Sequence, residues 1–208
     1  MLKGISKNFR KPQGFIGSVL LNGMNKGHEK LTKWALSQVE IGPGSVVLDI
    51  GCGGGNAIHL MSQKSKNVFG IDYSEVSVKK SGKKNAYAIA QGNVKICQGS
   101  VSALPFENEK FDLVTAFETI YFWPDLPGDF AEVCRVVKPG GCFMAVFQNG
   151  LEESTSRKLE GSIDGMRIYP PEEIVKLMED TGFAHTAMIE ETLQPGWRDI
   201  CVIGKKQP

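Results

Sequence analysis

The sequence lacks three features that would place it in a special class of protein. It has no apolar run near the ~20 residues that a membrane-spanning helix needs, and residues 15–21 are too short and too interrupted by glycine for a signal peptide. Its five cysteines include no C-x-x-C pair, so we expect reduced thiols and neither a zinc site nor a disulfide framework. Its 24 basic and 23 acidic residues nearly cancel, which argues against a nucleic-acid partner. These absences favour a cytoplasmic protein that binds neither membrane nor nucleic acid.

Glycine is the residue present in excess. There are 24 glycines in 208 residues, or 11.5 %, against ~7 % in average proteins. They do not form a linker or a collagen repeat, so the fold is expected to need many special backbone positions. The length suits one domain, residues 1–208, and leaves the oligomeric state open.

From residue 44 onward, short β-branched runs alternate with helical periodicity. The predicted strands are 45–50, 68–72, 94–98, 111–117 and 142–147, and the predicted helices are 56–63, 74–90, one ending at 137, and 171–181. Two more strands, 184–193 and 198–204, are joined by a Gln-Pro-Gly turn and predict an antiparallel hairpin. Residues 1–26 and 149–168 show no clear periodicity. The pattern predicts an α/β fold with a doubly wound, mostly parallel sheet.

The sharpest motif is the string VLDIGCGGGN at residues 47–56. Four of the five residues 51–55 are glycine, directly between a predicted strand and a predicted helix. Such a turn lets a ligand lie against bare backbone at the carboxyl end of a strand. A dinucleotide fingerprint would need glycine where Asn56 stands, which disfavours a nicotinamide oxidoreductase, and the G-K-[ST] of a phosphate-binding loop is absent.

This string resembles the first motif of class I S-adenosylmethionine-dependent methyltransferases, the D/E-x-G-x-G turn. Companion motifs follow in order: Asp72 after the second strand, QGS at 98–100, FDLV at 111–114 and RVVKPGG at 135–141. Over roughly residues 34–147 the blocks are similar to the "type 11" subgroup, which acts mostly on small molecules.

The resemblance implies a Rossmann-like methyltransferase fold with seven strands. It also implies methyl transfer from S-adenosylmethionine to a small-molecule acceptor by in-line attack on the sulfonium methyl, with S-adenosylhomocysteine as product. The alternative is a non-catalytic S-adenosylmethionine-binding or regulatory domain of the same fold. In this interpretation residues 1–40 form an N-terminal lid and helix region, 41–148 the cofactor-binding core, and 149–208 a C-terminal helix and hairpin.

The resemblance further implies roles for individual residues. The backbone of Gly51, Cys52 and Gly53 would line the methionine and ribose part of the cofactor, and Asp72 would hold the ribose hydroxyls. The other expected cofactor contacts are Asn56 at the end of the turn, Tyr73 on the adenine, Ser100 and Val101 at the adenine edge, and Phe117, Glu118 and Thr119 beside the methionine moiety.

Two of these cofactor assignments leave a question open. Asp49 would either contact the ligand or fix the turn by accepting backbone amides. Many relatives carry Asp where this chain has Ser100, so the strength of the adenine contact is undecided.

The acceptor site is expected after the fourth strand, at residues 118–124, where three adjacent aromatic residues can line a pocket. Asn25 and His28 are candidates for a lid that touches the cofactor carboxylate, although His28 could equally be an ordinary residue of a first helical turn. If the acceptor must lose a proton, the candidate bases are Glu118, Tyr121 and His28. No metal site is predicted. An N/D-P-P-Y/F motif and a Pro-Cys pair, typical of nucleic-acid and protein methyltransferases, are absent.

Overall fold

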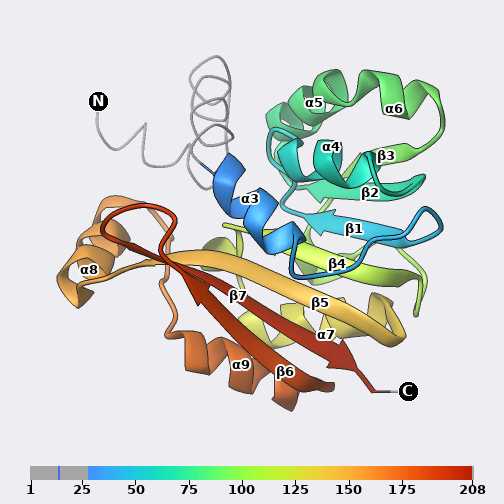
Figure 1. Cartoon of the computed structure of the whole chain (residues 1–208). Helices are drawn as coiled ribbons and strands as arrows, with labels where there is room; N and C mark the ends of the chain where they lie inside the picture. The colour runs from blue at the N-terminus through green and yellow to red at the C-terminus, as the bar shows by residue number, and fades with distance from the viewer. Residues whose placement is uncertain (1–13, 15–27, 208) are drawn as a thin grey trace.

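The computed structural model describes residue 14 and residues 28–207, whose strands form one seven-stranded sheet (Figure 1). The strands are β1 (Val46–Ile50), β2 (Asn67–Asp72), β3 (Val94–Gln98), β4 (Phe111–Phe117), β5 (Val137–Gly150), β6 (Phe183–Glu191) and β7 (Trp197–Lys206). They lie in the order β3-β2-β1-β4-β5-β7-β6, with β1 to β5 parallel and β7 antiparallel to both β5 and β6. This confirms the predicted fold class. The order reverses between β1 and β4, where ligands bind in such sheets.

Helices cover both faces of the sheet. They are α3 (Glu29–Leu36), α4 (Asn56–Ser62), α5 (Glu75–Lys84), α6 (Ala86–Ala90), α7 (Leu126–Val136), α8 (Glu153–Ser162), α9 (Pro171–Asp180) and the 3₁₀ turns η1 (Val101–Ala103) and η2 (Ile120–Phe122). Within residues 28–207, no helix is both long enough and apolar enough to cross a membrane.

Side chains alternate across each strand and build a separate apolar core on each face. In β5, Phe143 and Phe147 join the core beneath α7 and α9, whereas Met144 and Val146 join the core beneath α3 and α4. Figure 1 shows this division, with α7 and α9 on the side of the sheet opposite α3. The two cores explain why the central strands are apolar at nearly every position.

Two predicted boundaries were wrong, and one segment without clear periodicity contains a helix. The helix predicted at 74–90 is two helices, because Asn85 leaves helical geometry and its side chain donates to the carbonyls of Ser81 and Gly55. The strand predicted at 142–147 extends over Val137–Gly150, because β5 pairs with β4 on one side and with β7 on the other. The unpatterned stretch 149–168 contains α8.

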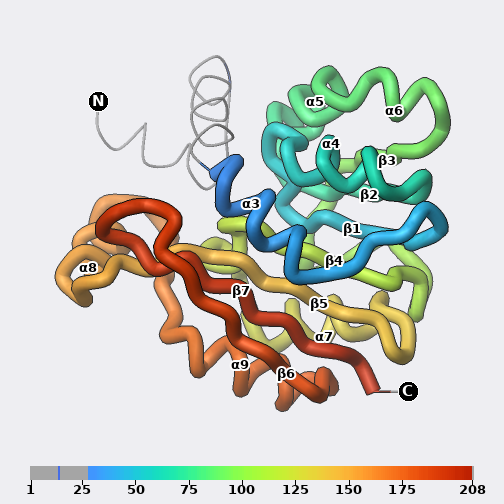
Figure 2. The backbone as a smooth tube through the Cα atoms, in the orientation of Figure 1, coloured from blue at the N-terminus to red at the C-terminus, as the bar shows by residue number. Residues whose placement is uncertain are grey.

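The carboxyl end of β5 extends well beyond that of β4. Its pairing with β7 continues as far as Gly150 opposite Trp197, and Figure 2 shows the chain returning through the β6–β7 hairpin toward the C-terminus. This extension brings residues of the C-terminal hairpin to the same edge of the sheet as the glycine-rich turn.

Candidate functional site

The glycine-rich turn is folded tightly over the ends of β1 and β2. The amides of Gly51 and Cys52 both donate to the carbonyl of Ile71, at 2.8 and 3.1 Å. Gly51 has a φ of +70°, and a Cβ on it would lie 2.3 Å from the Oγ1 of Thr119. Only glycine therefore satisfies both the left-handed backbone and the contact with Thr119.

The far end of the turn is anchored to the helices. Gly55, with a φ of +78°, is the residue before α4, and its carbonyl accepts a hydrogen bond from the Nδ2 of Asn85 at 3.1 Å. A Cβ on Gly55 would lie 2.3 Å from the Oγ of Ser81. Because α5 ends against the turn in this way, the turn is held from both sides.

Asp72 connects the end of β2 to this turn. One carboxylate oxygen accepts from the amide of Gly53 at 2.9 Å and the other accepts from the amide of Ser74 at 2.8 Å. Burial raises the pKa of Asp72, while these amides favour the ionised form. Each oxygen keeps a further lone pair that can accept from a ligand hydroxyl.

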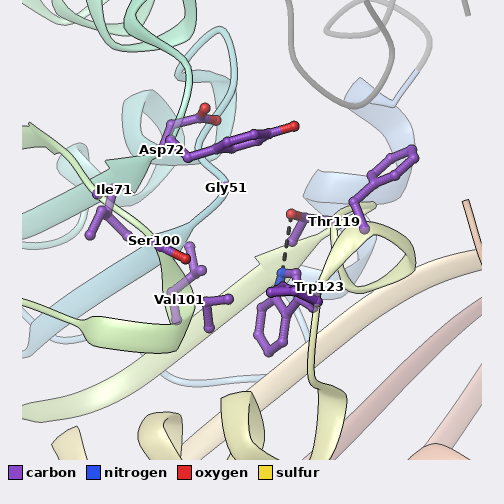
Figure 3. Close-up of a pocket in the computed structure, with 12 residues that line it drawn as sticks. Gly51, Ile71, Asp72, Ser100, Val101, Thr119 and Trp123 are labelled. Atoms are coloured by element: carbon purple, nitrogen blue, oxygen red, sulfur yellow. Dashed lines mark hydrogen bonds between the residues drawn. The ribbon is translucent and has the colours of Figure 1, made fainter. Parts of the chain in front are cut away.

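A pocket of about 550 Å³, counting its open mouth, lies between the turn and the segments that follow β2, β3 and β4 (Figure 3). It is lined by Ile50, Gly51, Ile71, Asp72, Tyr73, Gly99, Ser100, Val101, Thr119, Phe122, Trp123 and Pro124. In Figure 3, the Nε1 of Trp123 donates to the Oγ1 of Thr119 at 3.4 Å, and Ser100 and Val101 form another wall. Six predicted cofactor residues are thus brought together: Gly51, Asp72, Tyr73, Ser100, Val101 and Thr119.

The donor set of this pocket is compatible with a nucleoside. Asp72 offers carboxylate oxygens to a pair of hydroxyls, and Ile71 and Val101 offer apolar surface to a flat ring. Ile71 was not among the residues predicted from the sequence to contact a ligand. Its place one residue before the strand-end carboxylate was the available signal.

The wall after β3 is fastened to α7. The hydroxyl of Ser102 donates to a carboxylate oxygen of Asp129 at 2.6 Å, and the amide of Leu104 donates to Glu132 at 2.8 Å. Asp129 is buried, and its other oxygen accepts from the amide of Asp125. The position of Ser100 and Val101 therefore depends on α7 as well as on β3.

The other predicted cofactor residues are not among those that line this pocket. Asp49 is buried and accepts a hydrogen bond from the hydroxyl of Thr115 at 2.8 Å, and burial raises its pKa to about 7. Cys52 is also buried. Asn56 is the first residue of α4, and its buried Nδ2 has no hydrogen-bond partner in the protein. Phe117 is half-buried at the end of β4. Asn25 lies outside the described residues.

The three predicted proton-handling residues form a second group. The hydroxyl of Tyr121 lies 3.4 Å from Oε1 of Glu118, and Nε2 of His28 lies 3.9 Å from Oε2 of the same carboxyl. Glu118 has a left-handed φ of +55°. Burial raises the pKa of Glu118 to about 8, raises that of Tyr121, and lowers that of His28.

Two members of this second group were not predicted. The hydroxyl of Tyr121 donates to the carbonyl of Gln148 at 2.6 Å and accepts from its amide at 2.7 Å. The Nε2 of Gln148 donates to Asp199 at 2.5 Å, and Asp199 is fully buried. Gln148 directly follows the predicted strand 142–147, and Asp199 lies at the start of the predicted strand 198–204. A polar residue at the end of an apolar strand was the only signal that either faces a site.

The described residues contain no arrangement of side chains that could hold a metal ion. Among residues 28–207, no cluster of three or more His, Cys, Asp and Glu side chains is placed to hold a metal ion. The five cysteines, all within this range, are free thiols.

Comparison with known proteins gives a consistent result. Residues 48–145 match the model of a family described as a methyltransferase domain. A sterol 24-C-methyltransferase of Gibberella zeae is 38 % identical over 109 residues, which are 50 % of this chain and 28 % of that protein. A demethylmenaquinone methyltransferase of Shouchella clausii is 31 % identical over 117 residues, 55 % of this chain and 49 % of that protein. The chain spans less than half the length of these curated relatives.

A solved structure shares the fold along nearly its whole length. It is the methyltransferase in a complex with the Haloferax volcanii Trm112 methyltransferase activator, with a TM-score of 0.74 and 22 % identity. The likeness covers 92 % of this chain and 97 % of that one.

Proposed function

We propose, on the premise that residues 48–145 belong to the methyltransferase domain family, that the protein transfers a methyl group from S-adenosylmethionine to a small-molecule acceptor. The observation that supports this most is the pairing of the glycine-rich turn with Asp72, whose carboxylate accepts from the Gly53 amide at 2.9 Å. That pair offers bare backbone and a hydroxyl-binding carboxylate at the switch point of the sheet.

In this proposal the cofactor lies across the pocket with its ribose on Asp72. Ser100 and Val101 meet the adenine edge and Tyr73 packs on its face. The remaining proposed contacts are Asn25, His28, Asp49, Gly51, Cys52, Gly53, Asn56, Phe117, Glu118 and Thr119. When bound, S-adenosylmethionine supplies a methyl group on a positively charged sulfur, which makes that methyl electrophilic.

The residues of the chain position the acceptor and handle its proton. At neutral pH, the raised pKa values of Glu118 and Tyr121 keep both groups protonated, whereas the lowered pKa of His28 leaves a neutral imidazole. His28 is therefore the group that can accept a proton from an acceptor O–H or N–H, and Glu118 is a hydrogen-bond donor.

The proposed acceptor is a small, largely apolar molecule. Phe122 and Trp123 line the pocket next to Thr119, and the relatives named above are a sterol and a demethylmenaquinone methyltransferase. A formal charge of +1 favours such an acceptor over a nucleic acid. We also propose that the protein is cytoplasmic and that its 208 residues act as one domain.

A thermal-shift measurement tests the shared premise. S-adenosylhomocysteine at a hundred times its dissociation constant should add ~2.7 kcal/mol, which raises the melting temperature by about 5–10 °C, and NAD should not. Gly53→Arg, which fills the space beside the backbone, should abolish the shift, while Gly92→Arg, in open space, should keep it. The absence of any shift with the wild-type protein would refute the proposal.

Turnover distinguishes an enzyme from a binding domain of the same fold. The protein is incubated with methyl-labelled cofactor and a panel of sterols and quinols, and release of S-adenosylhomocysteine is followed. Cofactor binding with no product from any acceptor would favour the non-catalytic alternative.

A further inference from the structure

Asp199 is a fully buried carboxylate that the sheet places next to the proposed reaction site. It stands directly opposite Gln148 in the antiparallel pairing of β5 and β7. The neighbouring pair, Phe147 and Ile200, points into the core beneath α7 and α9, so Gln148 and Asp199 point to the other face, which α3 covers. His28 immediately precedes α3 and therefore shares this face.

Both oxygens of Asp199 are held by neutral donors. The Nε2 of Gln148 donates to one at 2.5 Å, and the amide of Leu193 donates to the other at 2.7 Å. Neutral donors fix the carboxylate in place without cancelling its charge. The hydroxyl of Tyr121 in turn donates to the carbonyl of Gln148 and accepts from its amide. Asp199 is therefore connected through Gln148 and Tyr121 to the residues around Glu118.

The hydroxyl of Tyr121 donates its proton to the carbonyl of Gln148, so the carboxyl of Glu118 has its hydrogen bond from the backbone of Gln148 and only longer contacts with Tyr121 and His28. Its distances to Tyr121 and to His28 are 3.4 and 3.9 Å, against 2.6 Å from Tyr121 to the Gln148 carbonyl. The ionisable groups that face Glu118 from the described chain are His28, Tyr121 and Asp199, and those that face His28 are Glu118 and Asp199. A second carboxylate in this confined group disfavours ionisation of Glu118 and favours protonation of His28.

We propose that Asp199 is a positioning residue of the reaction site, whose buried charge keeps a proton on the Glu118–His28 pair. The proposal rests on the proposed function, because it assigns the proton of the acceptor to this pair. In the transfer, the acceptor loses one proton to the neutral His28, which becomes an imidazolium, while Glu118 keeps the proton that it already holds. The C-terminal hairpin thereby sets the pH range in which the site can accept a proton.

Proton NMR titration of the full chain tests this without knowledge of the acceptor. The sequence has three histidines, His28, His59 and His185, so their ring signals can be resolved, and His28→Gln assigns the first. In Asp199→Asn the titration midpoint of His28 should fall by roughly half a pH unit or more, because a neighbouring negative charge is lost. His59 and His185 should not move.

Asp112→Asn is the matched control. Its carboxylate also accepts two hydrogen bonds, from the Val46 amide and from Lys138, but at the opposite end of β4. This variant should leave the midpoint of His28 unchanged. If Asp199→Asn fails to fold, Asp199→Ser provides the same neutral site with room for water.

A carboxyl carbon-13 titration of the wild-type protein gives an independent answer. At pH 6, Glu118 should be protonated, and an ionised Glu118 at this pH would overturn the proposal. An unmoved His28 midpoint in a folded Asp199 variant would do the same. If that variant still shows the S-adenosylhomocysteine shift, only the role of Asp199 fails, whereas a wild-type protein without the shift removes the proposed function itself.

Discussion

Gly51→Ala should destabilise the folded protein in two ways, through backbone strain and through overlap with Thr119. The left-handed backbone at Gly51, with φ of +70°, costs an L-residue about 1–2 kcal/mol. The new Cβ would also lie 2.3 Å from the Oγ1 and 2.8 Å from the Cβ of Thr119, an overlap that real structures essentially never show. Overpacking of this kind costs about 1–3 kcal/mol, so the sum is about 2–5 kcal/mol.

Gly92→Ala isolates the first of these costs. Gly92 has a φ of +76° and open space where a Cβ would be, in the connection between α6 and β3. Gly51→Ala should therefore be less stable than Gly92→Ala by about 1–3 kcal/mol, which lowers the melting temperature by a further ~2–12 °C at this chain length. Circular dichroism of both variants gives the difference.

Thr119→Gly in the Gly51→Ala background completes a double-mutant cycle. It removes the atoms that overlap and should recover the extra loss, leaving only the backbone cost. Calorimetry should also show that Gly51→Ala weakens S-adenosylhomocysteine binding at least tenfold, because Gly51 lines the pocket, while Gly92→Ala binds normally. Equal stabilities of Gly51→Ala and Gly92→Ala would refute the close contact with Thr119.

Three further changes test other parts of the site. Asp72→Asn should weaken S-adenosylhomocysteine binding in calorimetry by about 10- to 150-fold, since a charged hydrogen bond contributes ~1.5–3 kcal/mol. Asp129→Ala should weaken it about fivefold in the same assay, because the Ser102 segment loses a hydrogen bond of ~1 kcal/mol that fastens it to α7. Asp49→Asn should change the pH dependence of the free energy of unfolding, measured with denaturant. Because its pKa is raised to about 7, Asp49 holds a proton in the folded protein that it releases near pH 4 in the unfolded chain. Between pH 4 and 7 the wild type should therefore lose up to about 4 kcal/mol of stability relative to this variant.

Each of these has an outcome that would contradict it. Unchanged affinity in Asp72→Asn would exclude a ribose on that carboxylate. Equal affinity in Asp129→Ala would mean that β3 alone positions Ser100 and Val101. Parallel pH curves for the wild type and Asp49→Asn would show that Asp49 ionises normally in the folded state.

The local sequence was enough to determine the strands and the ligand-binding turn. The β-branched runs, the four glycines of residues 51–55 and the carboxylate at the end of the second strand are features of neighbouring residues. They predicted the α/β sheet and its C-terminal hairpin, because a strand and the residue that ends it are defined by short-range patterns. The place of Asp72 at the cofactor site was implied by the family resemblance.

The tertiary structure alone decided which distant residues meet. The contact of Gly51 with Thr119, the end of a helix at Asn85 and the pairing of Gln148 with Asp199 each join segments that are far apart in the chain. No periodicity of single residues carries that information, because it depends on strand order and register. The charge state of Glu118 depends on burial, and burial exists only once β4, β5, β7 and α3 have packed together.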